Sequence, residues 1–373
     1  MVVDVYSHNC NSAYLEELAV SLIRSYDGKK FDKQELLNHW LPPPEREEKR
    51  YTQDWPLYNA AQTKEKLLFL KLLDDATESI REPAALTSNG RPAEDRYDIA
   101  KALAIKSWSN LSSRRTIAEL QITKQLGYID AVPHFNTLTN YLRDPVITLI
   151  LHRLYTALAE PVKQIETHFA PDGTGFSVSS RKHWVDVRLE KSEQRDFCKL
   201  HAMCGVRTHV VARALVSEGT CNDSPLYGEL LTETAKIFTV REVSADAGYL
   251  SRQNVQLTAD AGAKPYIHPK KNTRPVAKGH YPAWNNMIWL WRTHQAAFLQ
   301  AYHQRSNVES GFSSIKRKFG SSVRSKDFIG QQNEVLLKVV CHNASMLTHA
   351  LLQFNISPQS LLSAQKPAFS RII

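Results

Sequence analysis

The chain has 373 residues, of which 42% are apolar and 23% are charged. This composition supports a buried core and excludes a disordered or fibrous chain, and the length favours two or three domains. No apolar run approaches the roughly 18 residues of a membrane span, and the N-terminus lacks a secretory signal pattern. We therefore expect a cytoplasmic protein that remains where it is made and has no membrane partner.

Positive charge is concentrated in the C-terminal part of the chain. The net charge is +9, but residues 1–160 carry 20 basic and 22 acidic side chains, whereas residues 161–373 carry 27 and 16. A basic excess of this kind favours a polyanionic partner such as a nucleic acid, because each neutralised phosphate releases counterions. Charge alone does not distinguish such a partner from a basic, solvated surface.

The first part of the chain is predicted to be helical. Residues 12–26 and 64–75 have apolar side chains at helical spacing, and a proline- and charge-rich arm separates them. Residues 96–160 are again helical and contain serines that can cap a helix start. This second segment is expected to form either a helix-turn-helix-like DNA-binding unit or a plain helical scaffold.

From about residue 163 the pattern changes to short β-rich tracts. Three antiparallel strands are predicted, followed by helix, strand, helix and strand, and then helix from about Asn285 onward. This order matches an α/β fold with a ribonuclease H-like mixed sheet. The predicted division is an N-terminal helical region with an irregular arm, a helical and possibly DNA-binding unit, a catalytic domain and a tail: 1–95, 96–160, 161–345 and 346–373.

The five cysteines do not form a disulfide framework. Their number is odd and no CxxC occurs, which favours a reducing compartment. Cys198, His201 and Cys204 form one local cluster on a predicted strand. The two cysteines would share one sheet face and the histidine the other, so a zinc site is disfavoured there.

Two aspartates stand where predicted strands end. Asp172 follows a β-like tract and precedes small residues, and Asp246 ends another tract and is followed by Gly248. Open α/β sheets place ligands at such strand ends, and divalent ions held by several carboxylates promote phosphodiester transfer. Taken singly, each aspartate also fits an ordinary turn.

A third carboxylate lies in a tract, residues 301–320, that is predicted as one helix. At 100° per residue, one face about 60° wide contains four functional side chains: Tyr302, Arg305, Glu309 and Lys316. An adjacent apolar stripe would pack on the sheet: Val308, Ile315 and Phe319. The alternative is a solvated amphipathic helix with an ion pair between Arg305 and Glu309.

This spacing, Tyr-x2-Arg-x3-Glu-x6-Lys, resembles the YREK signature of a large group of insertion-sequence transposases. Other landmarks of that family occur in the same order along this chain: the tract 172–176, the Lys-Leu-His tract 199–201, Asn222-Asp223, and Asp246-x-Gly248-Tyr249. The similarity spans about residues 165–345. Residues 56–145 resemble the N-terminal parts of some members more loosely.

The resemblance implies a DDE-type transposase of prokaryotic origin with a ribonuclease H-like catalytic core. Asp172, Asp246 and Glu309 would be catalytic and would hold two Mg²⁺ or Mn²⁺ ions. Tyr302, Arg305 and Lys316 would contact the transposon end in double-stranded DNA. Because strand transfer joins two ends, a homodimer on DNA is expected.

The sequence departs from the family pattern in two places. Pro171 precedes Asp172, so that strand must end there or have a free edge. The interval from Asp246 to Glu309 leaves little room for the large β insertion that some members carry. The basic loop around Lys270 and Lys271 is expected to protect the DNA tip instead.

Basic side chains follow each of the three carboxylates, which suits a cleft with phosphates along its walls. Lys270 and Lys271 are candidates for such contacts. Trp184 lies among basic residues and is the best candidate for stacking on an unpaired base, although core packing is the alternative.

Three other functions remain compatible with the sequence. The chain could be a metal-dependent nuclease that cleaves without joining, or a DNA-binding protein that has lost catalysis. It could also be a helical scaffold that is basic for no functional reason.

Overall fold

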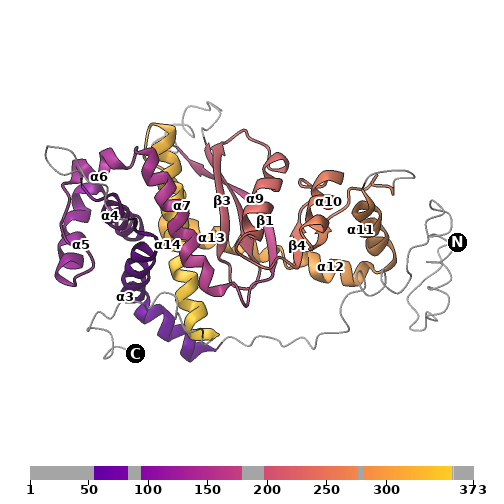
Figure 1. Ribbon diagram of the computed structural model, residues 1–373, viewed down its shortest axis with the longest axis horizontal. Coiled ribbons are helices and arrows are strands. Elements are labelled where there is room, and N and C mark those ends of the chain that lie inside the picture. Colours follow the sequence, from indigo (N-terminus) through magenta and orange to yellow (C-terminus); the bar gives the residue numbers. More distant parts are fainter. Residues whose placement is uncertain (1–53, 83–93, 179–196, 276–280, 355, 357–373) are drawn as a thin grey trace, which may run out of the picture.

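The computed structural model describes residues 54–82, 94–178, 197–275, 281–354 and 356. The helix predicted at 12–26 and Trp184 lie outside these residues. A group of helices surrounds the long helix α14 at one end of the molecule (Figure 1). The sheet lies in the middle, and a second helical group with α10, α11 and α12 lies at the other end.

The helices predicted at 64–75 and within 96–160 are confirmed. Each of the five α-helices described in this part of the chain begins at a capping side chain that accepts a backbone N–H two or three residues on: Asp54, Asp95, Ser112, His134 and Asp144. The bounds are α3 (Trp55–Ile80), α4 (Arg96–Ser109), α5 (Ser113–Gln125), α6 (Phe135–Tyr141), α7 (Pro145–Ala159) and the short η1 (Glu160–Val162). Whether they read DNA stays a prediction.

The central sheet has five strands in the order β3-β2-β1-β4-β5. β1 (His168–Ser177), β2 (Phe197–Gly205) and β3 (Val211–Glu218) are antiparallel. β4 (Glu242–Ala245) lies parallel to β1, and β5 (Lys264–Ile267) lies parallel to β4. Three antiparallel strands extended by two parallel ones make the ribonuclease H-like sheet that the sequence predicted.

The prediction that β1 ends near Asp172 is wrong. β1 continues from His168 to Ser177, and it pairs with β2 along this length, with Asp172 opposite Ala202. Pro171 is tolerated because the pairing of β1 with β4 covers only His168 and Phe169. The strand therefore has a free edge where the proline lacks its N–H, which is the second of the two expected outcomes.

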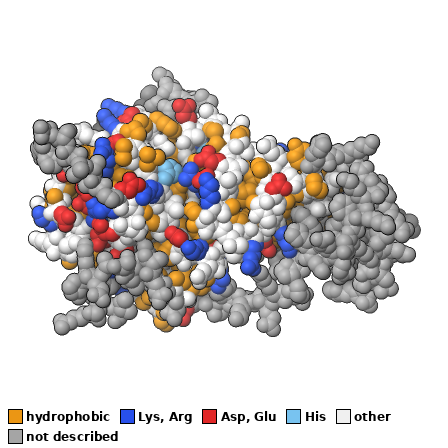
Figure 2. All heavy atoms as spheres, in the orientation of Figure 1, with side chains coloured by type: hydrophobic (Ala, Val, Ile, Leu, Met, Phe, Trp, Pro, Cys, Tyr) orange, Lys and Arg blue, Asp and Glu red, His pale blue; other side chains and the backbone are white. Residues whose placement is uncertain are grey.

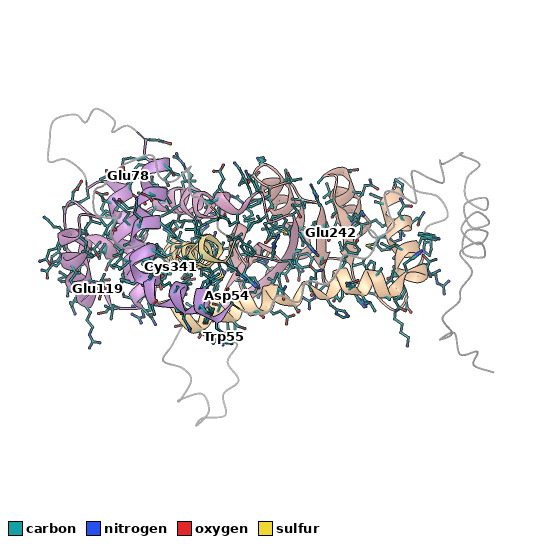
Figure 3. The ribbon with its side chains drawn as sticks, turned by 90° about the horizontal axis from the view of Figure 1, so that it is seen from below. Asp54, Trp55, Glu78, Glu119, Glu242 and Cys341 are labelled. Atoms are coloured by element: carbon teal, nitrogen blue, oxygen red, sulfur yellow. The ribbon has the colours of Figure 1, made fainter. Side chains whose placement is uncertain are left out.

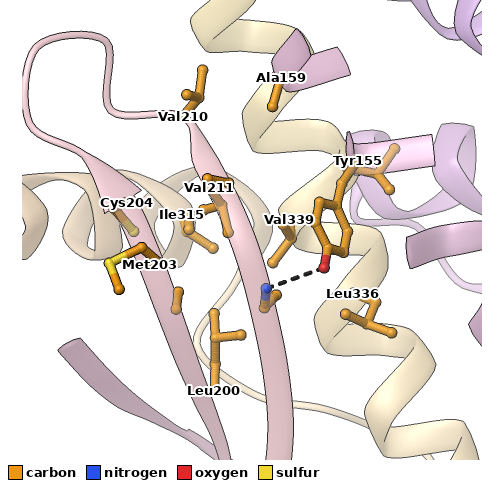
Figure 4. Packing of buried hydrophobic residues seen from close by; sticks show 14 of the residues in the cluster. Tyr155, Ala159, Leu200, Met203, Cys204, Val210, Val211, Ile315, Leu336 and Val339 are labelled. Carbon is orange, nitrogen blue, oxygen red and sulfur yellow. Dashed lines mark hydrogen bonds between the residues drawn. The ribbon is translucent and has the colours of Figure 1, made fainter. Parts of the chain in front are cut away.

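Helices cover both faces of the sheet and its β3 edge. The short η2 (Ser224–Leu226), α9 (Tyr227–Ala235) and α10 (Arg252–Asp260) lie on one face, and α13 (Ser306–Phe319) and α14 (Phe328–Gln353) lie on the other. Tyr155 of α7 accepts the backbone N–H of Ala214 on β3 (Figure 4), and the Asn343 side chain of α14 binds both backbone groups of Val211. These contacts satisfy backbone groups that an open edge strand would expose.

Helix α14 is the central core helix. It is long and apolar enough to cross a membrane by composition, but 78% of its apolar window is buried inside the protein. Cys341 of α14 contacts the carbonyl of Ala104 in α4 among the N-terminal helices (Figure 3). The predicted boundary at residue 345 falls inside this helix.

The described residues between β5 and Glu309 are largely helical. They include α11 (Pro282–Thr293) and α12 (Gln295–His303), where some family members carry a β insertion. On the face shown in Figure 2, acidic and basic side chains are interspersed over the described part of the surface.

Candidate active site

Asp172 and Asp246 lie on neighbouring parallel strands. The register pairs His168 with Glu242 and Phe169 with Val243. If the same offset is continued along both segments, Asp172 lies level with Asp246, which is the first residue after β4. The sheet topology therefore places these two predicted site residues together, although 74 positions separate them in the sequence.

The carboxylate of Asp172 is half-buried in β1. Burial raises the pKa of Asp172, and the negative charges of Asp246 and Glu309 raise it further, whereas the N–H of Gly173 and the charge of Arg305 act in the opposite direction. The Gly173 N–H donates to Asp172 Oδ1 over 2.8 Å. Asp172 is thus within electrostatic reach of both other predicted ligands.

Asp246 sits in a tight turn directly after β4. The N–H of Gly248 donates to Asp246 Oδ1 over 2.8 Å, and the N–H of Tyr249 donates to the Asp246 carbonyl over 3.2 Å. A Cβ atom at position 248 would lie 2.9 Å from Asp246 Oδ1. Glycine therefore allows the backbone to approach and orient this carboxylate.

Glu309 does not lie in one continuous helix with Tyr302, as the sequence predicted. α12 ends at His303 and α13 begins at Ser306, so Tyr302 and Glu309 belong to different helices, with Arg305 between them. Arg305 nevertheless connects them, because its Nη2 donates to Glu309 Oε1 over 3.0 Å and its Nε to the Tyr302 hydroxyl over 3.3 Å. The apolar stripe is confirmed: Val308, Ile315 and Phe319 are all buried.

The donor set fits divalent cations, although it is not gathered around one point. Carboxylate oxygens are the ligands preferred by Mg²⁺ and Mn²⁺, and the mutual repulsion at Asp172 is what a bound cation would relieve. Among the described residues, no three His, Cys, Asp or Glu side chains are close enough together to enclose an ion. The Glu309 side chain is 57% exposed and engaged with Arg305.

Three family landmarks that received no role from the sequence form a compact polar network. Asp223 Oδ1 lies 2.6 Å from His201 Nδ1, and Asp223 Oδ2 accepts from Lys199 Nζ over 2.8 Å. His201 Nε2 lies 2.8 Å from the Ser217 hydroxyl. Burial lowers the pKa of His201 despite the neighbouring carboxylate of Asp223. The histidine of the Cys198–Cys204 cluster is therefore committed to Asp223.

Comparisons with known proteins identify the family of the region that carries the three carboxylates. The family model described as "Transposase DDE domain" matches residues 163–344, which contain β1 to β5 and all three carboxylates. Residues 163–344 belong to the transposase DDE domain family. A relative from Archaeoglobus fulgidus, "Probable transposase for insertion sequence element ISA1214", is 26% identical over 242 residues, which cover 64% of this chain and 70% of that protein.

A solved structure is also similar to this transposase. The cryo-EM structure of the piggyBac transposase synaptic complex with hairpin DNA aligns with a TM-score of 0.36 and 12% identity, over 81% of this chain and 77% of that chain.

Basic residues of the transposase line a cavity at the loop that follows β5. β5 is parallel to β4, so the loop after β5 leaves the same sheet edge as Asp246, and the ring of His268 at its start contacts Tyr302 at 5.0 Å. The residues that come next in this loop line a cavity of about 560 Å³. Its lining residues include three cations and an indole: Arg252, Lys270, Arg274 and Trp284.

The other predicted DNA contacts fall in different places. Lys271 is exposed next to the cavity. Lys316 lies on α13, with its ammonium 5.6 Å from the centre of the Phe176 ring of β1, and burial lowers the pKa of this lysine. Trp284 is almost fully buried and donates to the carbonyl of Arg274, so it anchors the basic loop to α11.

Proposed function

We propose that this transposase cleaves DNA at the ends of its element and joins the freed 3′-OH ends to target DNA. Asp172, Asp246 and Glu309 would be the catalytic carboxylates and would hold two Mg²⁺ or Mn²⁺ ions. The observation that carries the proposal is the β1–β4 register, which brings Asp172 level with Asp246. Arg305, which is hydrogen-bonded to Glu309, also acts on Asp172, and this supports a site that includes the third carboxylate.

When bound, two divalent ions polarise the phosphodiester, provide a hydroxide equivalent at neutral pH and stabilise the leaving oxygen. The chain supplies orientation. Asp172 and Asp246 each have one carboxylate oxygen fixed by a backbone N–H, so both groups are aligned in advance. Glu309, which now accepts from Arg305, would be a ligand for a cation, and the Arg305 guanidinium would then be available for a DNA phosphate.

Residues near the three carboxylates would also contact double-stranded DNA. Arg305, with Tyr302 and Lys316, would hold the transposon end near the carboxylates. Lys270 and Lys271 would hold backbone phosphates farther along, since the described residues that line the neighbouring cavity include three cations and no acidic side chain. A homodimer would bring two ends together for joining. The stacking role of Trp184 remains a prediction from the sequence.

A cleavage and joining assay tests the proposal. The substrate is a supercoiled plasmid that carries the DNA flanking the gene, incubated with the full chain and Mg²⁺. We expect the wild type to nick at the element ends and to produce joined products, and Asp172→Asn to bind the DNA without either reaction. Nicking without joined products would indicate a nuclease, and full activity of Asp172→Asn would remove this aspartate from the mechanism.

A further inference from the structure

The hydroxyl of Tyr249 is an unsatisfied polar group beside the candidate active site. The side chain is only 2% exposed, and its hydroxyl has no hydrogen-bond partner among the described residues. A buried hydroxyl without a partner is costly, and most buried polar groups in folded proteins are paired. A hydrogen-bond acceptor that is absent from the free protein would remove this cost at the Tyr249 hydroxyl.

Backbone contacts place Tyr249 in the turn that carries Asp246 and tie this turn to the loop that carries Asp223. Tyr249 closes the turn that begins at Asp246. The buried side chain of Asn254 donates both to the Tyr249 carbonyl over 2.9 Å and to the Ser224 hydroxyl over 3.1 Å. Asn254 therefore ties the Asp246 turn to the loop that carries Asp223.

Electrostatics agree with this placement. Burial raises the pKa of Tyr249, and the charges of Asp223, Asp172 and Asp246 raise it further, in that order. An ionised carboxylate can only accept a hydrogen bond, so the phenol hydroxyl would be the donor toward any of these groups. Both oxygens of Asp223 already have partners in His201 and Lys199. Of the two proposed metal ligands, Asp172 acts on Tyr249 more strongly than Asp246 does.

We propose that Tyr249 is a positioning residue, whose hydroxyl donates a hydrogen bond to the carboxylate of Asp172 once DNA and divalent ions occupy the site. This inference rests on the proposed function. Gathering of the carboxylates around the ions gives the hydroxyl the acceptor that it lacks in the free protein. The bond in turn fixes one ligand oxygen, in the way that residues behind a metal site orient the ligands in front of them.

Tyr227 provides a matched control. Its ring lies 5.9 Å from that of Tyr249 and is also fully buried, but its hydroxyl is bonded to Thr258. Tyr249→Phe removes a hydroxyl without a partner, and Tyr227→Phe removes one with a partner. The two substitutions should therefore have opposite effects on stability and activity.

The first measurement compares Tm with the single-turnover rate of end cleavage. For Tyr249→Phe we expect an unchanged or higher Tm, unchanged affinity for end DNA in EDTA, and a rate lowered by about tenfold, which is the effect of one hydrogen bond to a charged group. For Tyr227→Phe we expect a lower Tm and an unchanged rate below that Tm. A lower Tm for Tyr249→Phe with an unchanged rate would assign Tyr249 a purely structural role and overturn the proposal.

The second measurement does not depend on turnover. It records the rise in Tm that end DNA and Ca²⁺ together produce in each protein. We expect a smaller rise for Tyr249→Phe than for the wild type, because the hydroxyl gains its partner only in the complex. An equal rise would overturn the proposal even if the wild type cleaves. If the wild type never cleaves, the proposed function fails, and this comparison still decides the role of Tyr249.

Discussion

Arg305 donates a hydrogen bond to Glu309 over 3.0 Å, and its charge also acts on Asp172. The guanidinium therefore compensates part of the negative charge of the site in the protein without metal. The site also stabilises the charged form of the Arg305 guanidinium. Although burial acts in the opposite direction, the hydrogen bond to Tyr302 and the charges of the two carboxylates raise the pKa of Arg305. A divalent ion and Arg305 should then compete for the same carboxylates.

The first prediction concerns this competition. Arg305→Gln should destabilise the metal-free protein by about 1 kcal/mol or less, because the pair with Glu309 is largely solvated. It should increase the rise in Tm caused by Mn²⁺ and should reduce cleavage, since the variant no longer has this guanidinium to hold a DNA phosphate. Thermal unfolding with and without Mn²⁺ measures the two stability effects. Arg292→Gln, an exposed change on α11, is the control, and equal Mn²⁺ effects in the two variants would argue against competition.

The second prediction concerns pH. Because the folded protein raises the pKa of Asp172 above its ordinary value of 3.8, this group favours folding at acidic pH and loses that contribution as the pH rises through the folded pKa. In EDTA at neutral pH, Asp172→Asn should therefore be more stable than the wild type by about 1 kcal/mol. The advantage should shrink toward pH 4 and should disappear in Mn²⁺, which stabilises only the wild type.

Urea unfolding across this pH range provides the measurement. Asp130→Asn, at an exposed aspartate between α5 and α6, is the control. The difference in its free energy of unfolding from that of the wild type should not follow the pH dependence expected for Asp172→Asn. If Asp172→Asn is less stable than the wild type in EDTA at neutral pH, the carboxylates do not repel each other as described.

The third prediction concerns the polar network under Asp172. A Cβ atom at Gly173 would lie 2.5 Å from Asp223 Oδ1 and 2.9 Å from Lys199 Cε. Gly173→Ala should therefore destabilise the protein by about 1–3 kcal/mol. Gly311→Ala in α13 is the control, because an added Cβ there meets no atom within 4 Å and should stabilise the helix by about 0.5–1 kcal/mol. Equal effects of the two alanines on urea unfolding would contradict the packing at Gly173.

The fourth prediction concerns the basic cavity. The double variant Lys270→Ala/Arg274→Ala should bind duplex DNA more weakly, and its salt dependence should decrease by about 0.9 log unit per log unit of salt for each phosphate that the variant no longer neutralises. Lys236→Ala/Arg241→Ala removes the same charge from exposed positions outside the cavity and is the control. Fluorescence anisotropy at several salt concentrations gives the two slopes. Equal slopes for the two double variants would exclude the cavity as a phosphate site.

The sequence predicted the order of the strands and helices better than the exact ends of these elements and the contacts around the three carboxylates. Strand and helix periodicity predicted the order of elements from β1 to α10, because one buried face imposes a clear pattern. The end of β1 was misplaced, because Pro171 is compatible with a strand whose neighbour β4 pairs only as far as Phe169. That pairing length is a property of the folded sheet and has no local signature in the sequence.

The break before Glu309 was missed for a similar reason. Helical periodicity continues from Tyr302 through Glu309, but the Asn307 side chain donates to the carbonyl of Val206, and the Asn307 carbonyl accepts from the ring of His209 in the β2–β3 hairpin. These contacts span about a hundred residues and anchor the start of α13 to the sheet. The network of Asp223 and the burial of the Tyr249 hydroxyl were missed because they depend on contacts between segments that are distant in the sequence.

The most direct test of the account is a crystal structure of the full chain with end DNA and Mn²⁺, with the ions located by their anomalous scattering. The account predicts two Mn²⁺ peaks about 3.5–4 Å apart, bound by Asp172, Asp246 and Glu309, with Arg305 released from Glu309. Peaks elsewhere, or Glu309 still bound to Arg305 and directed away from the ions, would contradict it.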